Sequence, residues 1–120
     1  MGVPASKRLR RPSDFLKVRS EGTRFLCGPF IFQARDARSE QGEANRFGVI
    51  ASRRVGNAVI RQRGKRIFRE IFRRNEAALP PGSDVVVVIR AGYGRYPYED
   101  LENRYLKACK NWTNTLNASE

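Results

Sequence analysis

Histidine is absent from this sequence, and cysteine and methionine are scarce. Without histidine the chain cannot form a Ser-His-Asp or Cys-His catalytic group, or a histidine-ligated zinc site. The two cysteines, Cys27 and Cys109, are far apart in the sequence and form no CxxC pair, which excludes a zinc ribbon and a thioredoxin-like motif. A single disulfide between them stays open, although two buried reduced thiols fit the sequence better.

Long apolar runs are also missing. The longest, residues 85–89, is far too short to cross a bilayer, and no apolar stretch follows the basic N-terminus as it would in a secretory signal. These features predict a soluble, cytoplasmic protein that makes no membrane contact. Nothing in the sequence implies an obligate protein partner.

The acidic residues are few and scattered. A two-metal nuclease needs several carboxylates that converge on one site. The densest acidic group, Glu99, Asp100 and Glu102, falls in the first turn of an expected helix, where the helix dipole favours negative charge. We therefore expect no catalytic residue, no metal ligand and no cofactor bound by this chain alone.

Positive charge is what the sequence has in excess. Its 24 Lys and Arg residues oppose 12 Asp and Glu residues, a formal net charge of +12, and the whole excess lies in residues 1–74. Most of these cations are arginines, whose planar guanidinium suits phosphate recognition. A polyanion such as a nucleic acid is the expected partner.

The hydrophobic pattern predicts six elements in a single domain over residues 1–120. They are a helix over 12–19 with Ser13 as its N-cap, a strand over 24–35 with Pro29 at a bulge or edge, a strand over 46–52, a helix from 57 or 58 to 75, a strand over 85–90 and a helix over 98–116. Residues 36–45 are expected to form a loop. Residues 1–11 are expected to be a mobile basic arm carrying Lys7, Arg8, Arg10 and Arg11.

The helix expected near residues 58–75 has two unlike faces. Its apolar face is formed by Ile60, Gly64, Ile67, Phe68, Ile71 and Phe72, and its basic face includes Lys65, Arg66, Arg69 and Arg73. Like charges three and four residues apart repel each other, so a bound polyanion would relieve this face. Gly64 should cost about 1 kcal/mol of helix propensity relative to alanine, so another contact must hold that turn.

The segment before this helix also suits an anion. Gly56 is expected in a tight turn and Asn57 at the N-cap, which places backbone N–H groups of a helix N-terminus beside Arg53, Arg54 and Arg61. Among the phenylalanines, most of which must pack in the core, Phe15 is the best candidate for stacking on a base of single-stranded RNA.

Residues 56–66, GNAVIRQRGKR, closely resemble the signature of the protein component of bacterial ribonuclease P. The similarity covers about residues 8–112 and includes Arg8–Arg10 before Asp14-Phe15, the Gly22-Thr23 turn, and residues 47–54 leading into the signature. It implies an α/β, or α+β, two-layer sandwich of order αβββαβα with a left-handed βαβ crossover. Right-handed crossovers are the general rule, and no spacing in the sequence predicts the exception.

The resemblance also implies a function. In this family the protein joins a large catalytic RNA, and the resulting endoribonuclease removes the 5′ leader from precursor tRNA. The RNA carries out the chemistry with bound magnesium ions, so the expected partners are the catalytic RNA and precursor tRNA. The protein recognises the leader in a central cleft and contacts the RNA through its Arg-rich helix.

Carried onto this chain, the resemblance implies two sets of site residues. The RNA-binding set is Arg53, Arg54, Asn57, Arg61, Gln62, Arg63, Lys65, Arg66 and Arg69, and the leader cleft holds Phe15, Arg19 and Gln33. Gln62 stands where the family usually has Asn, and Gly64 where a bulky aliphatic residue is common, which should loosen packing there. Arg19 and Gln33 stand where aromatic residues occur, so we expect this cleft to hold the leader more by Arg–phosphate contacts and Arg stacking than by two aromatic platforms.

Two other classes of protein remain. A structural RNA-binding protein of ribosomal type would explain the charge and the missing catalytic groups equally well, and only the ordered motif favours the processing subunit. A DNA-binding module ranks third, because the sequence has no helix-turn-helix or zinc-finger pattern.

Overall fold

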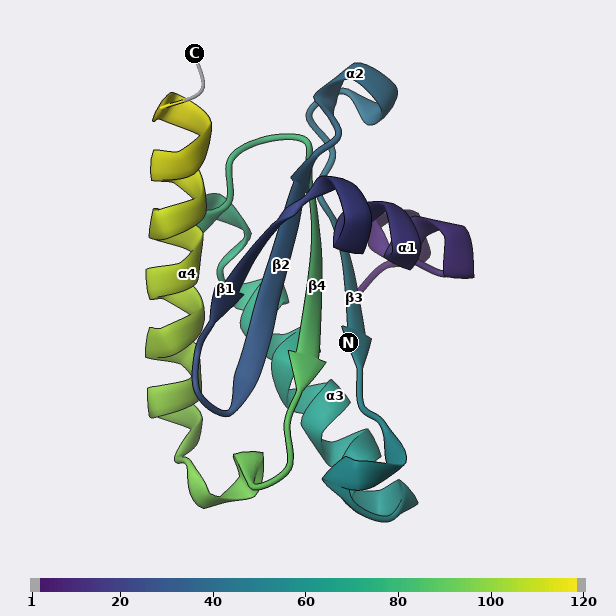
Figure 1. Ribbon diagram of the computed structural model, residues 1–120, viewed down its shortest axis with the longest axis vertical. Coiled ribbons are helices and arrows are strands. Elements are labelled where there is room, and N and C mark those ends of the chain that lie inside the picture. Colours follow the sequence, from purple (N-terminus) through teal and green to yellow (C-terminus); the bar gives the residue numbers. More distant parts are fainter. Residues whose placement is uncertain (1–2, 119–120) are drawn as a thin grey trace.

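A four-stranded mixed sheet with helices on both faces forms the core of the computed structural model, which describes residues 3–118 (Figure 1). The helices are α1 (Pro12–Glu21), α2 (Arg38–Gln41), α3 (Ala58–Arg74) and α4 (Tyr98–Ala118), and the strands are β1 (Thr23–Leu26), β2 (Phe30–Asp36), β3 (Arg46–Ile50) and β4 (Ser83–Ile89). Four 3-10 turns, η1 (Ala5–Lys7), η2 (Arg53–Val55), η3 (Glu76–Ala78) and η4 (Tyr93–Arg95), join them. Apart from the single turn α2, the order is αβββαβα, as the resemblance implied.

The strand expected over residues 24–35 is in fact a hairpin. β1 and β2 pair antiparallel, with Leu26 opposite Ile31, and the chain reverses at Gly28, whose φ of +83° lies in the left-handed region. Pro29 therefore sits beside the turn, and the expectation of a bulge or edge within one strand was wrong. The expected 36–45 loop likewise contains the single turn α2.

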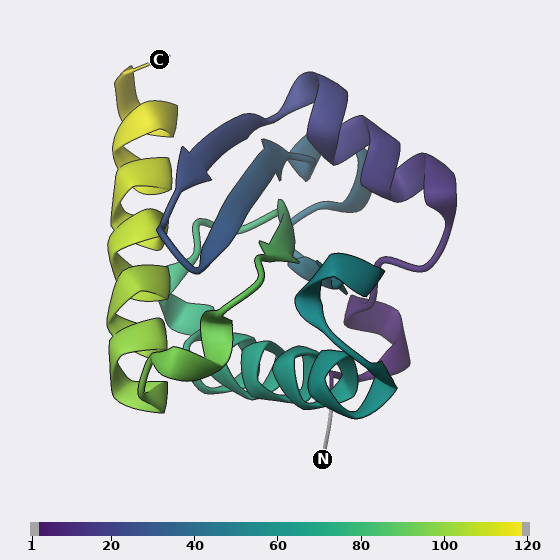
Figure 2. The same ribbon diagram turned by 60° about the horizontal axis from the view of Figure 1, so that its bottom comes forward.

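The parallel pair β3 and β4 is joined by a left-handed crossover through α3. The sheet order is β1-β2-β4-β3, with β3 and β4 parallel. In Figure 1 both arrows point down, β4 lies to the left of β3, and α3 passes behind the sheet. The turned view of Figure 2 moves α3 to the lower edge and α1 to the upper edge, which confirms that these helices lie on opposite faces.

The main core lies between the sheet and the helices α3 and α4. Phe30 and Phe32 from β2 and Val85 and Val87 from β4 are fully buried there, because successive strand residues point to opposite faces. The aromatic ring of Phe68 from α3 meets that of Phe30 edge-on, with 4.7 Å between ring centroids. α1 covers a smaller cluster on the opposite face, which includes Leu9, Val18 and Val86.

Helix α1 begins at Pro12 as expected, but its N-cap is not the residue that the sequence suggested. Arg11 is the N-cap and Pro12 the first helical residue, so Ser13 is not the cap. Proline is favoured at this first position because its missing N–H would have no partner there. Asp14 accepts a hydrogen bond from the Arg11 backbone N–H at 3.4 Å.

Residues 3–11 lie against the body of the protein. Val3 and Leu9 are buried, the backbone of Arg8 pairs with Phe47 of β3, and Lys7 forms an ion pair of 2.8 Å with Glu76. Residues 1 and 2 of the expected arm are outside the described residues. The mobility of this arm stays a prediction.

Tyr93 occupies the space that Gly64 leaves. A Cβ on Gly64 would lie 2.9 Å from Tyr93 Cζ and 3.0 Å from Ile89 Cδ1, and the Tyr93 hydroxyl donates a 2.5 Å hydrogen bond to the Ile60 carbonyl oxygen. The expectation that Gly64 would loosen the packing was therefore wrong. Ile60 was also misplaced, because its side chain is 42% exposed rather than buried.

Candidate nucleic-acid interface

The segment leading into α3 brings a helix N-terminus to the surface beside two arginines. Gly56 has a φ of +152°, which favours glycine, and Asn57 caps the helix by accepting a 3.0 Å hydrogen bond from the Ile60 N–H. Arg53 and Arg54 lie in η2, immediately before this turn, and both are exposed. The local structure is therefore the one expected for anion binding at a helix start.

The cations of the expected RNA-binding set form a surface without compensating acids. Of these residues, Arg53, Arg54, Arg63 and Arg66 are exposed, and Arg61, Lys65 and Arg69 are half-buried. None of the seven forms an ion pair within residues 3–118. Arg73 differs, because Glu70 pairs with it at 2.7 Å and raises its pKa further. We call these seven residues, with Asn57 and Gln62, the α3 surface.

Arg61 has a buried hydrogen-bond donor that is left unpaired within residues 3–118. Its Nε is buried and has no hydrogen-bond partner among the described residues. An unsatisfied buried donor costs about 1–3 kcal/mol. An anion bound to the same guanidinium would offset part of that cost.

The N-terminal arm meets the α3 surface. Arg8, Arg10 and Arg69 all line one small cavity of about 150 Å³, whose other walls come from Phe15 and β3. The Nε of Arg8 donates a 2.6 Å hydrogen bond to the Val3 carbonyl oxygen, which fixes the direction of its side chain. Two of the four arm cations therefore extend the positive surface of α3.

On the opposite face of the sheet, a cleft of about 650 Å³ lies beside α1. It gathers all three residues expected in the leader cleft, Phe15, Arg19 and Gln33. The remaining lining residues are Pro12, Leu16, Arg24, Ile31, Ile50 and Val88, so every strand of the sheet contributes. We call this hollow the central cleft.

Two sequence features shape the central cleft. β2 buries Phe30 and Phe32 in the main core, so the alternate residues Ile31 and Gln33 face the cleft. Gly48 of β3 makes room for Phe15, because a Cβ there would lie 2.6 Å from the Phe15 ring.

The cleft combines apolar and basic groups. Leu16 and Ile50 are 62% and 38% exposed, a high value for large apolar side chains. Arg19 and Arg24 are exposed and form no ion pair within residues 3–118. Apolar side chains beside unpaired guanidiniums can contact bases and phosphates of one strand together.

Most residues of the cleft walls could not be predicted from the sequence. Leu16, Arg24 and Ile50 come from three different elements, and only the folded sheet brings them together. The period-two pattern of β2 was the one available signal, since it already places Ile31 beside Gln33. A buried ion cluster was missed too, in which Asp84, only 1% exposed, accepts hydrogen bonds from Arg46 at 2.9 and 3.0 Å.

The described residues contain no group of three or more His, Cys, Asp or Glu side chains that could hold a metal ion. Cys27 and Cys109 are free thiols, and burial raises the pKa of each, to about 11 and about 12. No helix within residues 3–118 is long and apolar enough to cross a membrane. An α/β sandwich with an unneutralised basic helix and a basic, apolar cleft defines a nucleic-acid-binding protein.

Comparison with known proteins identifies the family. The family model for Ribonuclease P matches residues 3–113, so the chain belongs to the ribonuclease P protein family. It is 33% identical over 105 residues to the ribonuclease P protein component of Brevibacillus brevis, covering 88% of this chain and 82% of that one. The protein component of Syntrophomonas wolfei is 35% identical over 105 residues, covering 86% and 84%.

Solved structures agree with this assignment. The ribonuclease P protein of Thermotoga maritima superimposes with a TM-score of 0.76 at 31% identity, covering 87% of this chain and 96% of that one. That of Staphylococcus aureus, at 23% identity, shares the fold with a TM-score of 0.76 and covers 88% and 97%. Members of this family are the protein subunits of the endoribonuclease that processes the 5′ leader of tRNA.

Proposed function

We propose that this chain binds the 5′ leader of precursor tRNA in the central cleft and the catalytic RNA of ribonuclease P through the α3 surface. The observation that carries the proposal is the meeting of Phe15, Arg19 and Gln33 in one cleft that also holds exposed apolar side chains. A single-stranded leader offers unstacked bases to such a surface and phosphates to its arginines.

Each group in the cleft has a role that follows from its chemistry. The Phe15 ring rests on Gly48 and supplies an aromatic platform of fixed position. Arg19 and Arg24 can bind phosphate or stack on a base through their planar guanidiniums. Gln33 offers an amide that can donate to and accept from a base edge.

The α3 surface binds by charge and position rather than by base sequence. Its unpaired cations and the helix N-terminus at Asn57 are groups that hold RNA phosphates. Gln62 keeps the amide of the Asn usual in the family and extends it by one methylene. Arg8 and Arg10 of the N-terminal arm, beside Arg69, would add to the same contact.

The chemical step belongs to the RNA subunit in this proposal. Magnesium ions bound by that RNA would supply the activation of water and the stabilisation of the leaving oxygen. This chain would bind and orient the leader through the side chains of the central cleft. The work would take place in the cytoplasm, where precursor tRNA is made and matured.

A leader-specific defect tests this role of the cleft. Arg19→Ala removes an exposed guanidinium without disturbing the core, so the holoenzyme should bind leader-bearing precursor tRNA about 1–2 kcal/mol more weakly. That change is roughly a five- to thirtyfold rise in Kd. Binding of mature tRNA, which lacks the leader, should be unchanged.

Lys17→Ala is the matched control. Lys17 is a cation on the same helix that pairs with Glu40 and does not line the cleft. It should leave both affinities unchanged. An equal loss for precursor and mature tRNA in the Arg19 variant would refute the assignment of the cleft and favour a structural RNA-binding role.

A further inference from the structure

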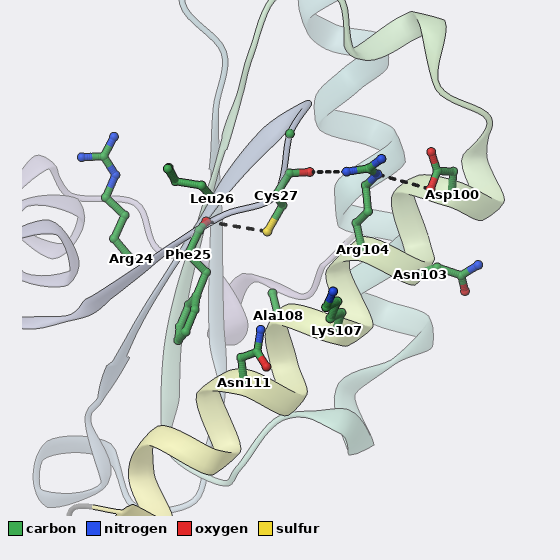
Figure 3. Close-up of a pocket in the computed structure, with 11 residues that line it drawn as sticks. Arg24, Phe25, Leu26, Cys27, Asp100, Asn103, Arg104, Lys107, Ala108 and Asn111 are labelled. Atoms are coloured by element: carbon green, nitrogen blue, oxygen red, sulfur yellow. Dashed lines mark hydrogen bonds and ion pairs between the residues drawn. The ribbon is translucent and has the colours of Figure 1, made fainter.

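A second groove, of about 640 Å³, lies between the β1–β2 hairpin and α4. One wall is formed by β1 and the turn after it, and the other by α4 (Figure 3). The lining residues are Arg24, Phe25, Leu26, Cys27, Gly28, Asp100, Asn103, Arg104, Lys107, Ala108 and Asn111. We call it the β1–α4 groove.

The α4 wall presents a row of polar side chains. Asn103, Lys107 and Asn111 are exposed and four residues apart, so they share one face of the helix along the groove. In Figure 3 they follow one another down α4 opposite the hairpin. A row of two amides and one ammonium can bind base edges and phosphates along a strand.

The hairpin wall adds an open sheet edge. β1 is the end strand in the order β1-β2-β4-β3, so its outer backbone groups have no neighbouring strand. Leu26 of this strand is 71% exposed, the second-highest value among the large hydrophobic residues that reach the surface. The side chain of Leu26 lies on the same face of the sheet as that of its partner Ile31 and points away from α4 (Figure 3), so β1 meets the groove through its backbone edge.

Arg104 fixes the groove and leaves its charge positive. Its Nε pairs with Asp100 at 3.2 Å, its Nη1 donates to the Cys27 carbonyl oxygen at 3.1 Å, and its guanidinium lies 5.0 Å from the centre of the Tyr96 ring. The Asp100 charge is therefore already neutralised. Arg24 and Lys107 form no ion pair within residues 3–118, so the groove attracts an anionic ligand.

Arg24 joins this groove to the central cleft. It lines both hollows, and β1 is the single strand that separates them. A single-stranded RNA that leaves the cleft at Arg24 therefore reaches the β1–α4 groove without crossing another helix or strand of the protein.

From this continuity we infer that the β1–α4 groove binds the upstream part of a long 5′ leader, beyond the nucleotides held in the central cleft. The inference rests on the proposed role of the cleft in leader binding. It makes Lys107 and Asn103 leader-binding residues whose effect depends on leader length. The charged groups of the groove that form no ion pair within residues 3–118, Arg24 and Lys107, are cations. They favour an anionic RNA strand over a peptide strand paired with the edge of β1.

The test is a leader-length series bound to the holoenzyme assembled from this chain and a bacterial ribonuclease P RNA. Leaders of about 2 to 16 nucleotides span the range of sites used by single-strand-binding proteins. Lys107→Ala should leave the Kd for the short leaders unchanged and raise it roughly three- to tenfold for the long ones. For long leaders alone, the slope of log K against log salt should become shallower by about 0.7, the value for one phosphate contact on a single strand.

Two variants complete the design. Lys110→Ala removes a cation three residues further along α4 that does not line the groove, and it should have no effect at any length. Asn103→Ala is the second groove variant and should repeat the length dependence of Lys107→Ala without the change in salt slope.

The possible results separate this inference from the proposed role of the cleft. If Arg19→Ala weakens binding of all leaders while Lys107→Ala affects none, the leader-binding role of the central cleft is supported and the groove does not bind leader. If Lys107→Ala weakens binding equally at every leader length, or weakens assembly with the catalytic RNA, the groove binds a different part of the complex and the inference is overturned.

Discussion

At the scale of single residues, Gly64 and Tyr93 show how a local weakness is compensated. A glycine inside a helix costs about 1 kcal/mol in propensity, and the sequence alone marks only that cost. The structure places the buried Tyr93 ring over Gly64, with its hydroxyl bonded to the Ile60 carbonyl oxygen. The glycine is thus a packing residue, and the turn is held by a side chain from η4 that no sequence pattern connects to it.

Gly64→Ala should therefore destabilise the protein despite the gain in helix propensity. The new methyl group would press on Tyr93, which is fixed at both its ring and its hydroxyl, and overpacking of this kind costs about 1–3 kcal/mol. We expect a net loss of about 1 kcal/mol in urea unfolding, after the gain of about 1 kcal/mol in propensity.

Gly94→Ala is the control for this substitution. Gly94 is exposed and a Cβ there would meet open space. The free energy of unfolding of this variant should therefore differ from that of the parent protein by less than about 0.5 kcal/mol. Equal stability of the two variants would show that Tyr93 moves aside freely and that the contact is not restrictive.

The buried thiol of Cys109 predicts a loss of stability in alkali. Burial raises its pKa from 9.0 to about 12, so between about pH 9 and pH 12 the unfolded chain loses a proton that the folded chain keeps. The stabilising effect is complete below pH 9 and is lost as the pH rises through that window. Its slope approaches about 1.4 kcal/mol per pH unit.

Thermal unfolding of Cys109→Ala measures this contribution. The variant should have a lower Tm at pH 7 because it leaves a small cavity, but its Tm should fall less steeply than that of the parent protein above pH 9. Cys27 and Tyr105, whose pKa values burial also raises, would account for the slope that remains. Parallel curves for the two proteins would contradict the assignment to Cys109.

At the scale of elements, α3 is the one whose structure follows most directly from the sequence. Its bounds, its Asn57 cap and its buried Phe68, Ile71 and Phe72 are as the helical pattern predicts. The β1–β2 hairpin was missed although Gly28-Pro29 is a dipeptide typical of turns. The aromatic residues also change there from an odd position, Phe25, to even positions, Phe30 and Phe32. The left-handed φ of Gly28 shows that the chain reverses at this point.

Each cation removed from α3 should weaken RNA binding by the contribution of one phosphate contact. Arg66 is exposed and unpaired among the described residues, and alanine is the best helix former, so Arg66→Ala should fold normally. Binding to ribonuclease P RNA should weaken, and the slope of log K against log salt should become shallower by about 1. Filter binding over a range of salt concentrations gives both quantities.

The control for this experiment is again Lys110→Ala, which removes a cation from α4 outside the α3 surface. It should leave the salt slope as in the parent protein. An unchanged slope in the Arg66 variant as well would mean that this face of α3 does not contact the RNA.

At the scale of the whole molecule, the sequence predicts partner and family better than it predicts the shape of the binding surfaces. Charge distribution and the ordered run of residues 56–66 need no folded structure to be recognised. The central cleft can be recognised only in the folded structure, because side chains from α1 and all four strands form it. The left-handed crossover was implied by the family alone, since general chain chirality favours the opposite hand.

The most direct test of the proposed function is cleavage of a precursor tRNA by a bacterial ribonuclease P RNA at low magnesium, with and without this protein. We expect a marked increase in cleavage rate, with the mature 5′ end formed at the correct nucleotide. Tight RNA binding without any stimulation, repeated with several ribonuclease P RNAs, would contradict the proposed function and indicate a structural RNA-binding protein.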